Sequence, residues 1–394
     1  FFQAEDGIRD CLLSRGLGDV YKRQESIKGI KMNIEEESST EKFTGTMQVQ
    51  EKLKIPEKEL ETYLNDNVDD FEGPLEVREF KGGQSNPTYQ LVTPKKKYVL
   101  RRKPPGKLLP SAHAVDREYK VITALNSTGF PVPKTYKLCL DESVIGTIFY
   151  VMEMVEGNIY WEPTIPEVDN KLRAKIYIEK NKTLSDLHNT NYKDIGLEDF
   201  GKPGNYFSRQ ISRWTKQYIA SETEKIIEMN KLIDWLPNNI PGDDETSIVH
   251  GDYRLDNMVI DRNTSKVSAV LDWELSTLGH PLGDFTYHLM QWYMPGDGTG
   301  AGTQTLSNTD LKSIGVPSAE DYIKMYCDNT NRKEIENIDF YLSYNFFRLA
   351  GILQGIIGRV RDGTAASEHA EDRADRVRPL AESGWFYAQK AGAV

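Results

Sequence analysis

The sequence predicts an α+β chain of two lobes, an N-terminal antiparallel β lobe with one key helix and a mainly helical C-terminal lobe. Up to Glu156-Gly157, the residue patterns read as two strands, one helix and two strands, and beyond this point most apolar positions repeat at helical spacing. The helical part also contains the stretch His250–Asn257, which combines several chemically active side chains and leads into a strand. A chain of 394 residues is long enough to give one large two-lobed unit an ample core.

Composition limits the classes of function. The chain is 38% hydrophobic and 28% charged, and it has no apolar run near the roughly 20 residues that a bilayer span needs, so we expect a globular protein without a membrane partner. The chain has 60 acidic and 49 basic residues. The resulting net charge of −11 argues against nucleic acid as a partner, although it is compatible with a local basic pocket for an anion. Cys11, Cys139 and Cys327 lie far apart, which favours a reducing, cytoplasmic compartment, with import into an organelle left open.

The first 47 residues are expected to lie outside the fold. Residues 1–24 have neither an apolar signal region nor a cleavage site, and they resemble translated sequencing-adapter read-through, so we expect an artefact there and a true start at Met32. Residues 25–47 contain too few apolar side chains to fold alone and are predicted to be a disordered leader. The two lobes are then expected at 48–156 and at 157–394.

The N-terminal lobe is predicted element by element. A short amphipathic helix is expected from Val49 to Asn65, where Pro56 is tolerable only in the first turn, and an extended segment from Phe71 to Glu79 follows. Ser111 is a candidate cap for a helix that runs to about Ser127. The strand-like runs on either side of that helix form two pairs, Thr88–Val92 with Tyr98–Arg102 around a Pro-Lys-Lys-Lys turn, and Lys134–Leu140 with Thr147–Val155.

The C-terminal lobe is predicted to be helical with one short hairpin. The expected helices are Lys171–His188, Tyr206–Asn230, Ala319–Tyr326, Ile338–Arg361 and Ala370–Ala391. Two short strands, near Asn257–Ile260 and Val267–Leu271, interrupt them and are joined by an Asn-Thr-Ser turn.

The strongest chemical signal is the sequence HGDYRLDN at 250–257. A His, an Asp two residues later and an Asn five residues further match the catalytic-loop pattern of phosphoryl-transfer enzymes, in which the carboxylate of Asp252 would orient the attacking hydroxyl. The hairpin would bring Asn257 and Asp272 to one end of its sheet, where their oxygens could bind a divalent metal ion together with two phosphates. The alternative is a capped turn with solvated carboxylates.

These residues support a resemblance to a known family. HGDYRLDN, followed by LDWE and GHPLGDF, resembles the aminoglycoside phosphotransferase and choline kinase-like superfamily, which shares its fold with protein kinases. Within it, FKGGQSNPTYQL, GKPGNYFSRQISRWTKQY and FRLAGILQG resemble the kinase-like domain of acyl-CoA dehydrogenase family members 10 and 11, in a stand-alone form. The likeness runs from about Phe80 to Tyr387. It implies a protein-kinase-like bilobal fold and an enzyme that uses ATP and Mg²⁺ to phosphorylate an alcohol group. The lobe at 48–156 would then bind the nucleotide, and the lobe at 157–394 would hold the catalytic loop and the acceptor site.

Several residues are predicted to bind the nucleotide. Paired glycines let backbone N–H groups approach a triphosphate, so the loop after Phe80 is a candidate, although a plain turn is equally compatible; its binding residues would be Gly82, Gly83, Ser85 and Asn86. Arg101 stands where the family has a phosphate-binding Lys, and an Arg can also clamp phosphate oxygens. Glu118 lies on the apolar stripe of its helix, where a carboxylate is costly unless it is paired, and Arg101 is the expected partner; a rim position is the alternative.

Further residues are predicted to surround this centre. Glu153 and Val155 follow an apolar strand and resemble the hinge whose backbone groups bind adenine. His250 and Asp284 are expected to support the catalytic loop through hydrogen bonds, rather than to react.

The acceptor is predicted from local charge and from the resemblance. The segments around Arg209 and Arg213 and around Arg348 contain basic residues without acidic ones, which favours an anionic acceptor such as a coenzyme A ester, unless these are ordinary solvated helix faces. The resemblance implies phosphorylation of 4-hydroxyacyl-CoA, within acyl-CoA metabolism and fatty acid catabolism. The alternatives are a small-molecule kinase of the aminoglycoside or choline type and a catalytically weak, nucleotide-binding regulatory module. The sequence does not indicate an oligomeric state.

Overall fold

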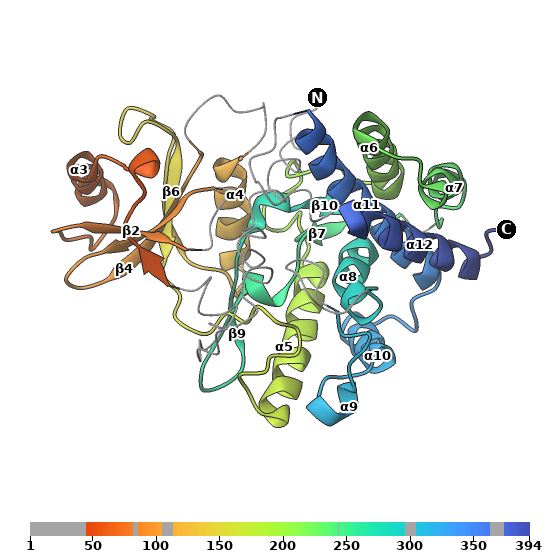
Figure 1. Cartoon of the computed structure of the whole chain (residues 1–394). Helices are drawn as coiled ribbons and strands as arrows, with labels where there is room; N and C mark the ends of the chain where they lie inside the picture. Colours follow the sequence, from red (N-terminus) through yellow and green to blue (C-terminus); the bar gives the residue numbers. More distant parts are fainter. Residues whose placement is uncertain (1–44, 82–85, 105–112, 243, 296–304, 363–373) are drawn as a thin grey trace, which may run out of the picture.

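The chain forms two lobes that meet along one side of helix α4 (Figure 1). The computed structural model describes residues 45–81, 86–104, 113–242, 244–295, 305–362 and 374–394. The N-terminal lobe is built around an antiparallel sheet and the C-terminal lobe around helices, as the sequence predicts.

The N-terminal sheet has six strands in the order β1-β2-β3-β4-β6-β5. Burial alternates along β2 and β3, so one face of these strands is turned to the core, whereas β4 and β6 are buried along most of their length. The strands are β1 (Thr46–Met47), β2 (Glu76–Phe80), β3 (Thr88–Val92), β4 (Lys97–Arg102), β5 (Thr135–Cys139) and β6 (Phe149–Glu153). The prediction of a disordered leader over 25–47 is corrected at its end, because Thr46 and Met47 pair with Phe80 and Glu79 at the sheet edge. Backbone pairing orders a segment that its side chains alone could not order.

Two helices flank this sheet. The predicted helix from Val49 is wrong at its start, because a 3₁₀ turn over Glu51–Leu53 precedes α3 (Glu57–Asn67) and Pro56 stands as the N-cap. A proline disfavours helical geometry in the residue before it, so the two pieces do not merge. Helix α4 (Val115–Asn126) lies between the sheet and the C-terminal lobe (Figure 1). Its predicted cap, Ser111, lies outside the described residues.

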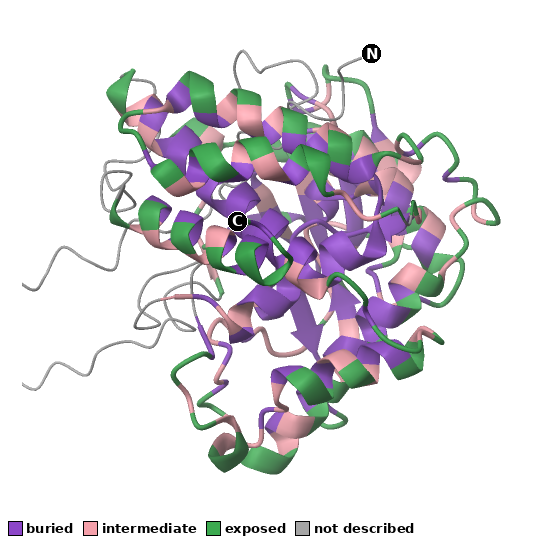
Figure 2. Cartoon of the chain, turned by 90° about the vertical axis from the view of Figure 1, so that its right-hand side faces the viewer, coloured by how far each residue is buried: buried purple, intermediate pink, exposed green. Residues whose placement is uncertain are grey.

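The C-terminal lobe packs helices around two small sheets. The sheets pair β7 (Ser247–Val249) with β10 (Thr277–Gly279), and β8 (Met258–Ile260) with β9 (Val267–Val270). The helices are α5 (Asn170–Asn189), α6 (Tyr206–Ser221), α7 (Ile227–Trp235), α8 (Pro281–Leu289), α9 (Leu311–Ile314), α10 (Ala319–Asn329), α11 (Ile338–Arg361) and α12 (Ala374–Lys390). Helix α11 is buried along most of its length and packs against α6, α8 and α12, so it is the centre of this lobe (Figure 1). Figure 2 shows exposed residues on the outer faces of the helices and buried residues in the interior.

The helices of the C-terminal lobe differ from the sequence prediction in three places, one of which is α9, a four-residue helix that was not predicted. The single helix expected over 206–230 is divided into α6 and α7, because α11 provides partners for the carbonyls where α6 ends: Gln354 donates to the Ser221 carbonyl at 2.7 Å and Arg361 to that of Glu222 at 3.0 Å. Helix α8 was not predicted, although Pro281 at its first position is a helix-start signal. This helix positions part of the site described below.

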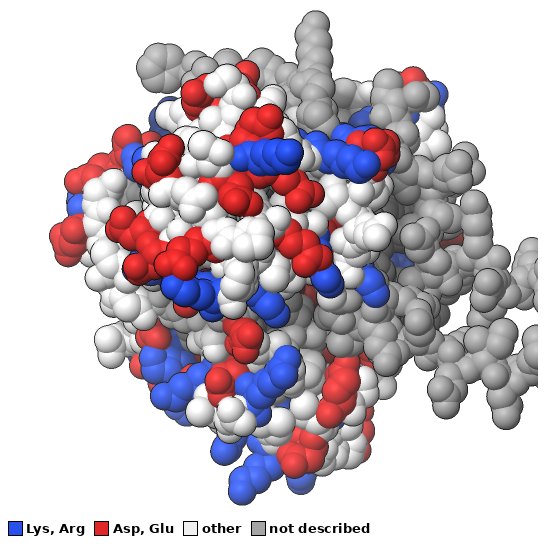
Figure 3. Space-filling model, turned by 90° about the vertical axis from the view of Figure 1, so that its left-hand side faces the viewer, with Lys and Arg blue, Asp and Glu red and all other residues white. Residues whose placement is uncertain are grey.

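The surface agrees with the composition. Figure 3 looks onto the N-terminal lobe and shows acidic and basic side chains interspersed, so the described residues of this face do not form a uniform basic surface for nucleic acid. Within the described ranges, no helix combines the length and apolar character that crossing a bilayer requires.

Candidate active site

The candidate catalytic turn, residues 250–252, follows β7, and hydrogen bonds to Asp284 on α8 hold it in place. Gly251 has a φ of +83°, and a Cβ on it would lie 2.8 Å from the Leu275 carbonyl oxygen, so the turn requires glycine here. The two carboxylate oxygens of Asp284 accept the backbone N–H groups of His250, at 2.7 Å, and of Gly251, at 2.9 Å. These bonds satisfy the turn's buried donors, and Asp284 has the supporting position that the sequence predicted. Burial alone would raise the pKa of Asp284, but hydrogen bonds from the His188 side chain and the His250 backbone N–H outweigh it, so the pKa is lowered.

His250 is fixed in one tautomer. Its Nδ1 accepts the Asp252 backbone N–H at 3.2 Å, and its Nε2 therefore donates to the Leu271 carbonyl at 2.9 Å. Both ring nitrogens are thus engaged in joining the turn to the end of β9. This arrangement matches the predicted structural role.

Asp252 is fully buried, and its carboxylate accepts hydrogen bonds from two neutral donors. Asn257 donates its Nδ2 to the Asp252 backbone carbonyl at 2.8 Å and to its Oδ2 at 3.3 Å. Tyr287 on α8 donates its hydroxyl to Oδ1 at 3.3 Å. The sequence analysis missed Tyr287, because its signal, a tyrosine three residues after Asp284, has meaning only once α8 is recognised. These contacts fix the direction in which the carboxylate points.

Asp272 lies where β9 ends, in a left-handed conformation with φ of +66°. The Leu271 N–H donates to the Asn257 carbonyl at 2.8 Å, so the hairpin brings Asn257 and Asp272 to one end, as predicted. Carboxylate and amide oxygens suit Mg²⁺, which commonly takes its remaining ligands from phosphates and water. Among the described residues there is no cluster of three or more His, Cys, Asp or Glu suited to a metal, so a metal ion here would depend on such outside ligands.

Arg101 connects the two lobes. Its Nε lies 2.9 Å from Glu118 Oε2, which forms the predicted ion pair, and its Nη2 lies 2.7 Å from Asp272 Oδ1. A third carboxylate, Glu274, is 3.4 Å away and was missed, because the sequence does not show that it turns toward β4. Burial, with a smaller contribution from Glu274, raises the pKa of Glu118 to about 7 against the opposing effect of Arg101. Three carboxylates around one guanidinium leave this end of the site rich in negative charge.

Asn86 is an anchor within this cluster. Its Nδ2 donates to Glu118 at 2.8 Å and to Glu274 at 3.1 Å, and its Oδ1 lies 2.9 Å from His113 Nδ1. The side chain is 1% exposed. The prediction that Asn86 contacts the nucleotide is therefore corrected, since its carboxamide is engaged inside the protein and fastens the end of the glycine loop. Gly82, Gly83 and Ser85 of that loop lie outside the described residues.

The predicted hinge connects β6 to the C-terminal lobe. The Glu153 N–H donates to the Lys134 carbonyl at 2.8 Å, and its carboxylate accepts the Lys134 N–H at 3.3 Å. These contacts engage the Glu153 N–H and carboxylate at the sheet edge, and binding of adenine by the Glu153 backbone stays a prediction. Val155 lies in the connection that follows, before Asn158 pairs with Ile260.

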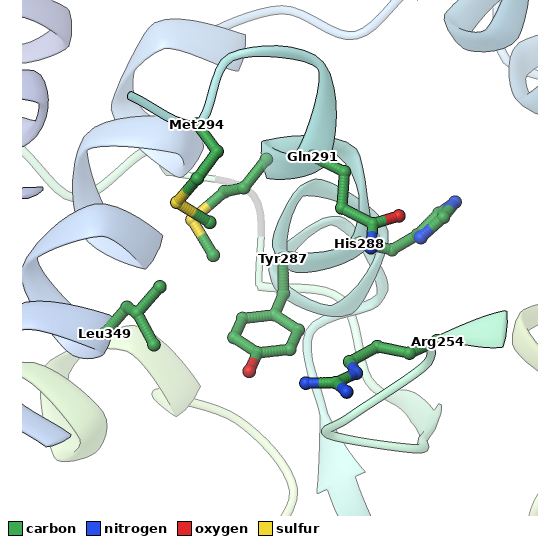
Figure 4. A pocket seen from close by; sticks show the side chains of 7 residues that line it. Arg254, Tyr287, His288, Gln291, Met294 and Leu349 are labelled. Carbon is green, nitrogen blue, oxygen red and sulfur yellow. The ribbon is translucent and has the colours of Figure 1, made fainter. Parts of the chain in front are cut away.

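A cavity lies beside the catalytic turn (Figure 4). Its lining residues are Arg254, Tyr287, His288, Met290, Gln291, Met294 and Leu349. The Arg254 guanidinium and the Tyr287 hydroxyl point toward the same space, and Met294 and Leu349 lie on the opposite side of it. Because the Tyr287 hydroxyl also reaches Asp252, the cavity adjoins the candidate catalytic carboxylate.

The three arginines predicted for the acceptor do not line this cavity. Arg209 donates to the carbonyls of Gly204 and Lys202, and the guanidinium of Arg213 lies over the Trp214 ring. Arg348 is buried behind the turn, where it donates to the Gly251 carbonyl at 3.0 Å and lies over the Tyr287 ring. This position indicates that Arg348 supports the turn and does not contact an acceptor.

Known proteins are similar in sequence to most of this chain. The family model of the phosphotransferase enzyme family, APH, matches residues 76–310. Acyl-CoA dehydrogenase family member 10 of Mus musculus is 41% identical over 348 residues, which cover 88% of this chain and 32% of that relative. Acyl-CoA dehydrogenase family member 11 of Homo sapiens is 43% identical over 339 residues, covering 84% and 43% respectively. The chain thus spans between a third and a half of the length of these relatives.

Solved structures share the fold. A crystal structure from Ralstonia eutropha JMP134, provisionally assigned as an aminoglycoside phosphotransferase, is 49% identical, has a TM-score of 0.79 and covers 86% of this chain and 99% of its own. Aminoglycoside phosphotransferase APH(4)-Ia, solved with AMP-PNP and hygromycin B, is 13% identical with a TM-score of 0.54, over 85% of this chain and 99% of its own. The second likeness concerns the fold alone.

Proposed function

Because the chain belongs to the phosphotransferase enzyme family, we propose that it transfers the γ-phosphoryl group of ATP to a hydroxyl group of a small molecule. The observation that carries the proposal is Asp252, a fully buried carboxylate directed by Asn257 and Tyr287, with Asp272 at the adjoining hairpin end. Phosphoryl transfer needs little covalent chemistry from the protein, and it depends on positioning and on stabilising charge.

Asp252 would orient the acceptor. A carboxylate that accepts the hydrogen bond of the acceptor hydroxyl turns an oxygen lone pair toward the γ-phosphorus and receives the proton as the new P–O bond forms. The bonds from Asn257 and Tyr287 limit rotation of the carboxylate, so that less positional freedom is lost when the reactants meet.

The opposite end would hold the nucleotide. Arg101 can donate to phosphate oxygens while Glu118 fixes its guanidinium. Asn257 and Asp272 would hold Mg²⁺, which when bound offsets the negative charge of the phosphates. Glu118 and Glu274 fasten Asn86, and with it the end of the glycine loop, near this position.

For the acceptor, we propose a hydroxyacyl thioester such as a 4-hydroxyacyl-CoA. Two observations support this class: the names of the mammalian relatives refer to acyl-CoA, and the residues that line the cavity include Arg254 and no carboxylate. An aminoglycoside carries several positive charges and favours an acidic pocket. The second candidate, a kinase of the aminoglycoside type, is favoured by the provisional assignment of the Ralstonia structure.

The test is ADP release by purified protein with Mg-ATP. The acceptors to compare are 4-hydroxyacyl-CoA, kanamycin and choline, and the mass of each product should show one added phosphoryl group. We expect turnover with the thioester. Turnover with kanamycin or choline alone would support the second candidate. Nucleotide binding without transfer to any acceptor would contradict both and favour a regulatory module.

A further inference from the structure

We propose that Arg117 on α4 is a positioning residue, which fastens this helix to the C-terminal lobe and thereby keeps Glu118 beside Arg101. The inference rests on the proposed function and deepens it, because Glu118 fixes the guanidinium that would bind the phosphates of the nucleotide. Arg117 would act through Glu118 and would not itself touch the nucleotide. The sequence analysis assigned no role to Arg117.

Arg117 makes a two-part contact with Phe200, in the segment that follows α5. Its Nη2 donates to the Phe200 carbonyl at 2.6 Å, and its guanidinium lies 4.4 Å from the centre of the Phe200 ring. Burial lowers the pKa of Arg117, so this contact is partly shielded from water. Because hydrogen bonds from charged donors and cation–π contacts strengthen when water is excluded, the contact holds α4 firmly against this segment.

The receiving end of this contact is well anchored. Phe200 is 1% exposed and belongs to the hydrophobic core. Gly201, the next residue, lies so close to β10 that a Cβ on it would be 2.5 Å from Thr277 Oγ1. Strand β10 pairs with β7, which leads into the candidate catalytic turn at 250–252. Through Phe200, Arg117 thus connects α4 to the small sheet that carries this turn.

Glu118 is the next residue on α4, the helix that lies between the two lobes (Figure 1). Neighbouring residues of an α-helix point about 100° apart, so Arg117 can reach the C-terminal lobe while Glu118 faces the N-terminal sheet. Glu118 accepts hydrogen bonds from Asn86, at 2.8 Å, and from Tyr150, at 3.1 Å. It also pairs with Arg101. A shift of α4 would change all of these contacts, so the position of the helix determines how firmly Arg101 is held.

The surroundings of Glu118 explain why a contact outside this cluster matters. Glu274 lies beside the same guanidinium, and the amide of Asn86 donates to both carboxylates. Like charges repel, and removal from water disfavours a charged carboxylate; both effects raise the pKa of Glu118. They oppose the position of α4 that the ion pair with Arg101 requires. The contact between Arg117 and Phe200 offsets them.

A second contact between the same two segments provides the matched control. Lys120, three residues after Arg117 on α4, pairs with Asp199 at 2.5 Å. These two side chains are 42% and 77% exposed, and an exposed ion pair contributes little, because water solvates both charges. Loss of Arg117 should therefore affect the nucleotide site, and loss of Lys120 should not.

The experiment measures binding of Mg-AMP-PNP, an ATP analogue, by titration calorimetry, and records the melting temperature of each variant. Arg117→Met keeps the aliphatic part of the side chain and removes the guanidinium. We expect its Kd to rise about 10-fold, near the lower end of what a hydrogen bond to a charged group contributes. Arg117→Lys can still donate to the carbonyl and should stay within about 3-fold of the native Kd. Lys120→Met should stay within about 2-fold.

If Arg117→Met does not fold, Phe200→Leu is the substitute. It removes the ring beneath the guanidinium and keeps the backbone carbonyl, so we expect a smaller rise in Kd, of about 3-fold. An unchanged Kd in this variant would then count against the inference.

A double-mutant cycle tests whether Arg117 acts through Glu118. Glu118→Gln keeps the shape of the side chain and removes the charge that pairs with Arg101, so its Kd should also rise by about 10-fold or more. In the Glu118→Gln background, Arg117→Met should change the Kd by less than about 2-fold, because the two residues belong to one chain of contacts.

The outcomes separate this inference from the proposed function. An unchanged Kd in Arg117→Met overturns the inference, as does an equal rise in Lys120→Met. Full additivity of the Arg117→Met and Glu118→Gln effects overturns it as well. Since binding needs no acceptor, a protein that binds Mg-AMP-PNP but phosphorylates nothing contradicts the proposed function, and the binding data still decide the inference. Native protein that does not bind the analogue contradicts both.

Discussion

The two aspartates at the ends of the candidate site have different kinds of partner. Asp272 lies 2.7 Å from the guanidinium of Arg101, within a group that also contains Glu118 and Glu274. Asp252 accepts hydrogen bonds from the amide of Asn257 and the phenol of Tyr287, at 3.3 Å each. One aspartate thus forms an ion pair, and the other accepts hydrogen bonds from neutral donors.

This difference suits the two reactants. Phosphate groups and a divalent ion are strongly charged and of opposite sign, so the guanidinium can attract the phosphates while carboxylate oxygens bind the metal ion. A hydroxyl group is neutral and must be aligned, which neutral bonds to a single carboxylate achieve without cancelling its charge. Substitutions at the two ends should therefore affect different kinetic constants.

The largest effect is expected at the acceptor end. Asp252→Asn keeps the shape of the side chain but removes the carboxylate that orients the hydroxyl and takes its proton, so kcat should fall by about 10³-fold or more. Affinity for Mg-ATP should stay within about 3-fold. Steady-state kinetics and titration calorimetry measure the two quantities. Turnover close to that of the native protein would remove Asp252 from its assigned role.

Arg101 should produce the opposite pattern. Arg101→Met leaves three carboxylates without their common guanidinium, so the KM for Mg-ATP should rise by about 10- to 100-fold. Arg101→Lys restores the charge without the fork and should recover part of this loss. Both KM values come from ADP release at varied nucleotide concentration. An unchanged KM in Arg101→Met would show that this end does not bind phosphate through Arg101.

A smaller effect is expected at Asn86. Asn86→Ala removes the donor shared by Glu118 and Glu274, so we expect these carboxylates to be less well fixed beside Arg101 and the KM for Mg-ATP to rise about 3- to 10-fold. Asn65→Ala, which changes an exposed asparagine on α3, is the control and should leave KM unchanged. An equal effect of both variants on KM would argue against the anchor.

The smallest effect concerns stability behind the acceptor end. Lys180 is fully buried, and burial lowers its pKa from 10.5 to about 7, against the effect of Asp256. Between these values the unfolded chain holds a proton that the folded chain lacks, so the contribution of Lys180 makes folding more favourable as pH rises. Lys180→Met should raise the melting temperature by ~2 °C or more at pH 6.5, with a difference that shrinks toward pH 10. A difference independent of pH would contradict the lowered pKa.

The sequence predicted the parts of the site that depend on short-range pattern. The spacing from His250 to Asn257, with the hairpin to Asp272, was sufficient to bring the metal-binding candidates together, because a hairpin brings the ends of its two strands side by side. The pairing of Arg101 with Glu118 followed from the cost of a carboxylate on an apolar helix face.

Other parts depend on tertiary contacts that no local pattern shows. Asn86 appeared to be a loop residue facing phosphate, but Glu274, 188 positions away, engages its amide inside the protein. The charge of Arg348 suggested an acceptor site, whereas α11 buries it behind the catalytic turn. Tyr287 could not be assigned without α8, whose nine residues are too few for periodicity alone to reveal.

The most direct test of the central claim follows the phosphoryl group itself. Phosphorus NMR of the protein with Mg-ATP and a 4-hydroxypentanoyl thioester should show a phosphate monoester that grows in step with ADP, and only when the acceptor is present. Asp252→Asn should not form this signal, although it binds the nucleotide. ADP that appears with inorganic phosphate alone, at a rate independent of every acceptor supplied, would contradict transfer to a hydroxyl group.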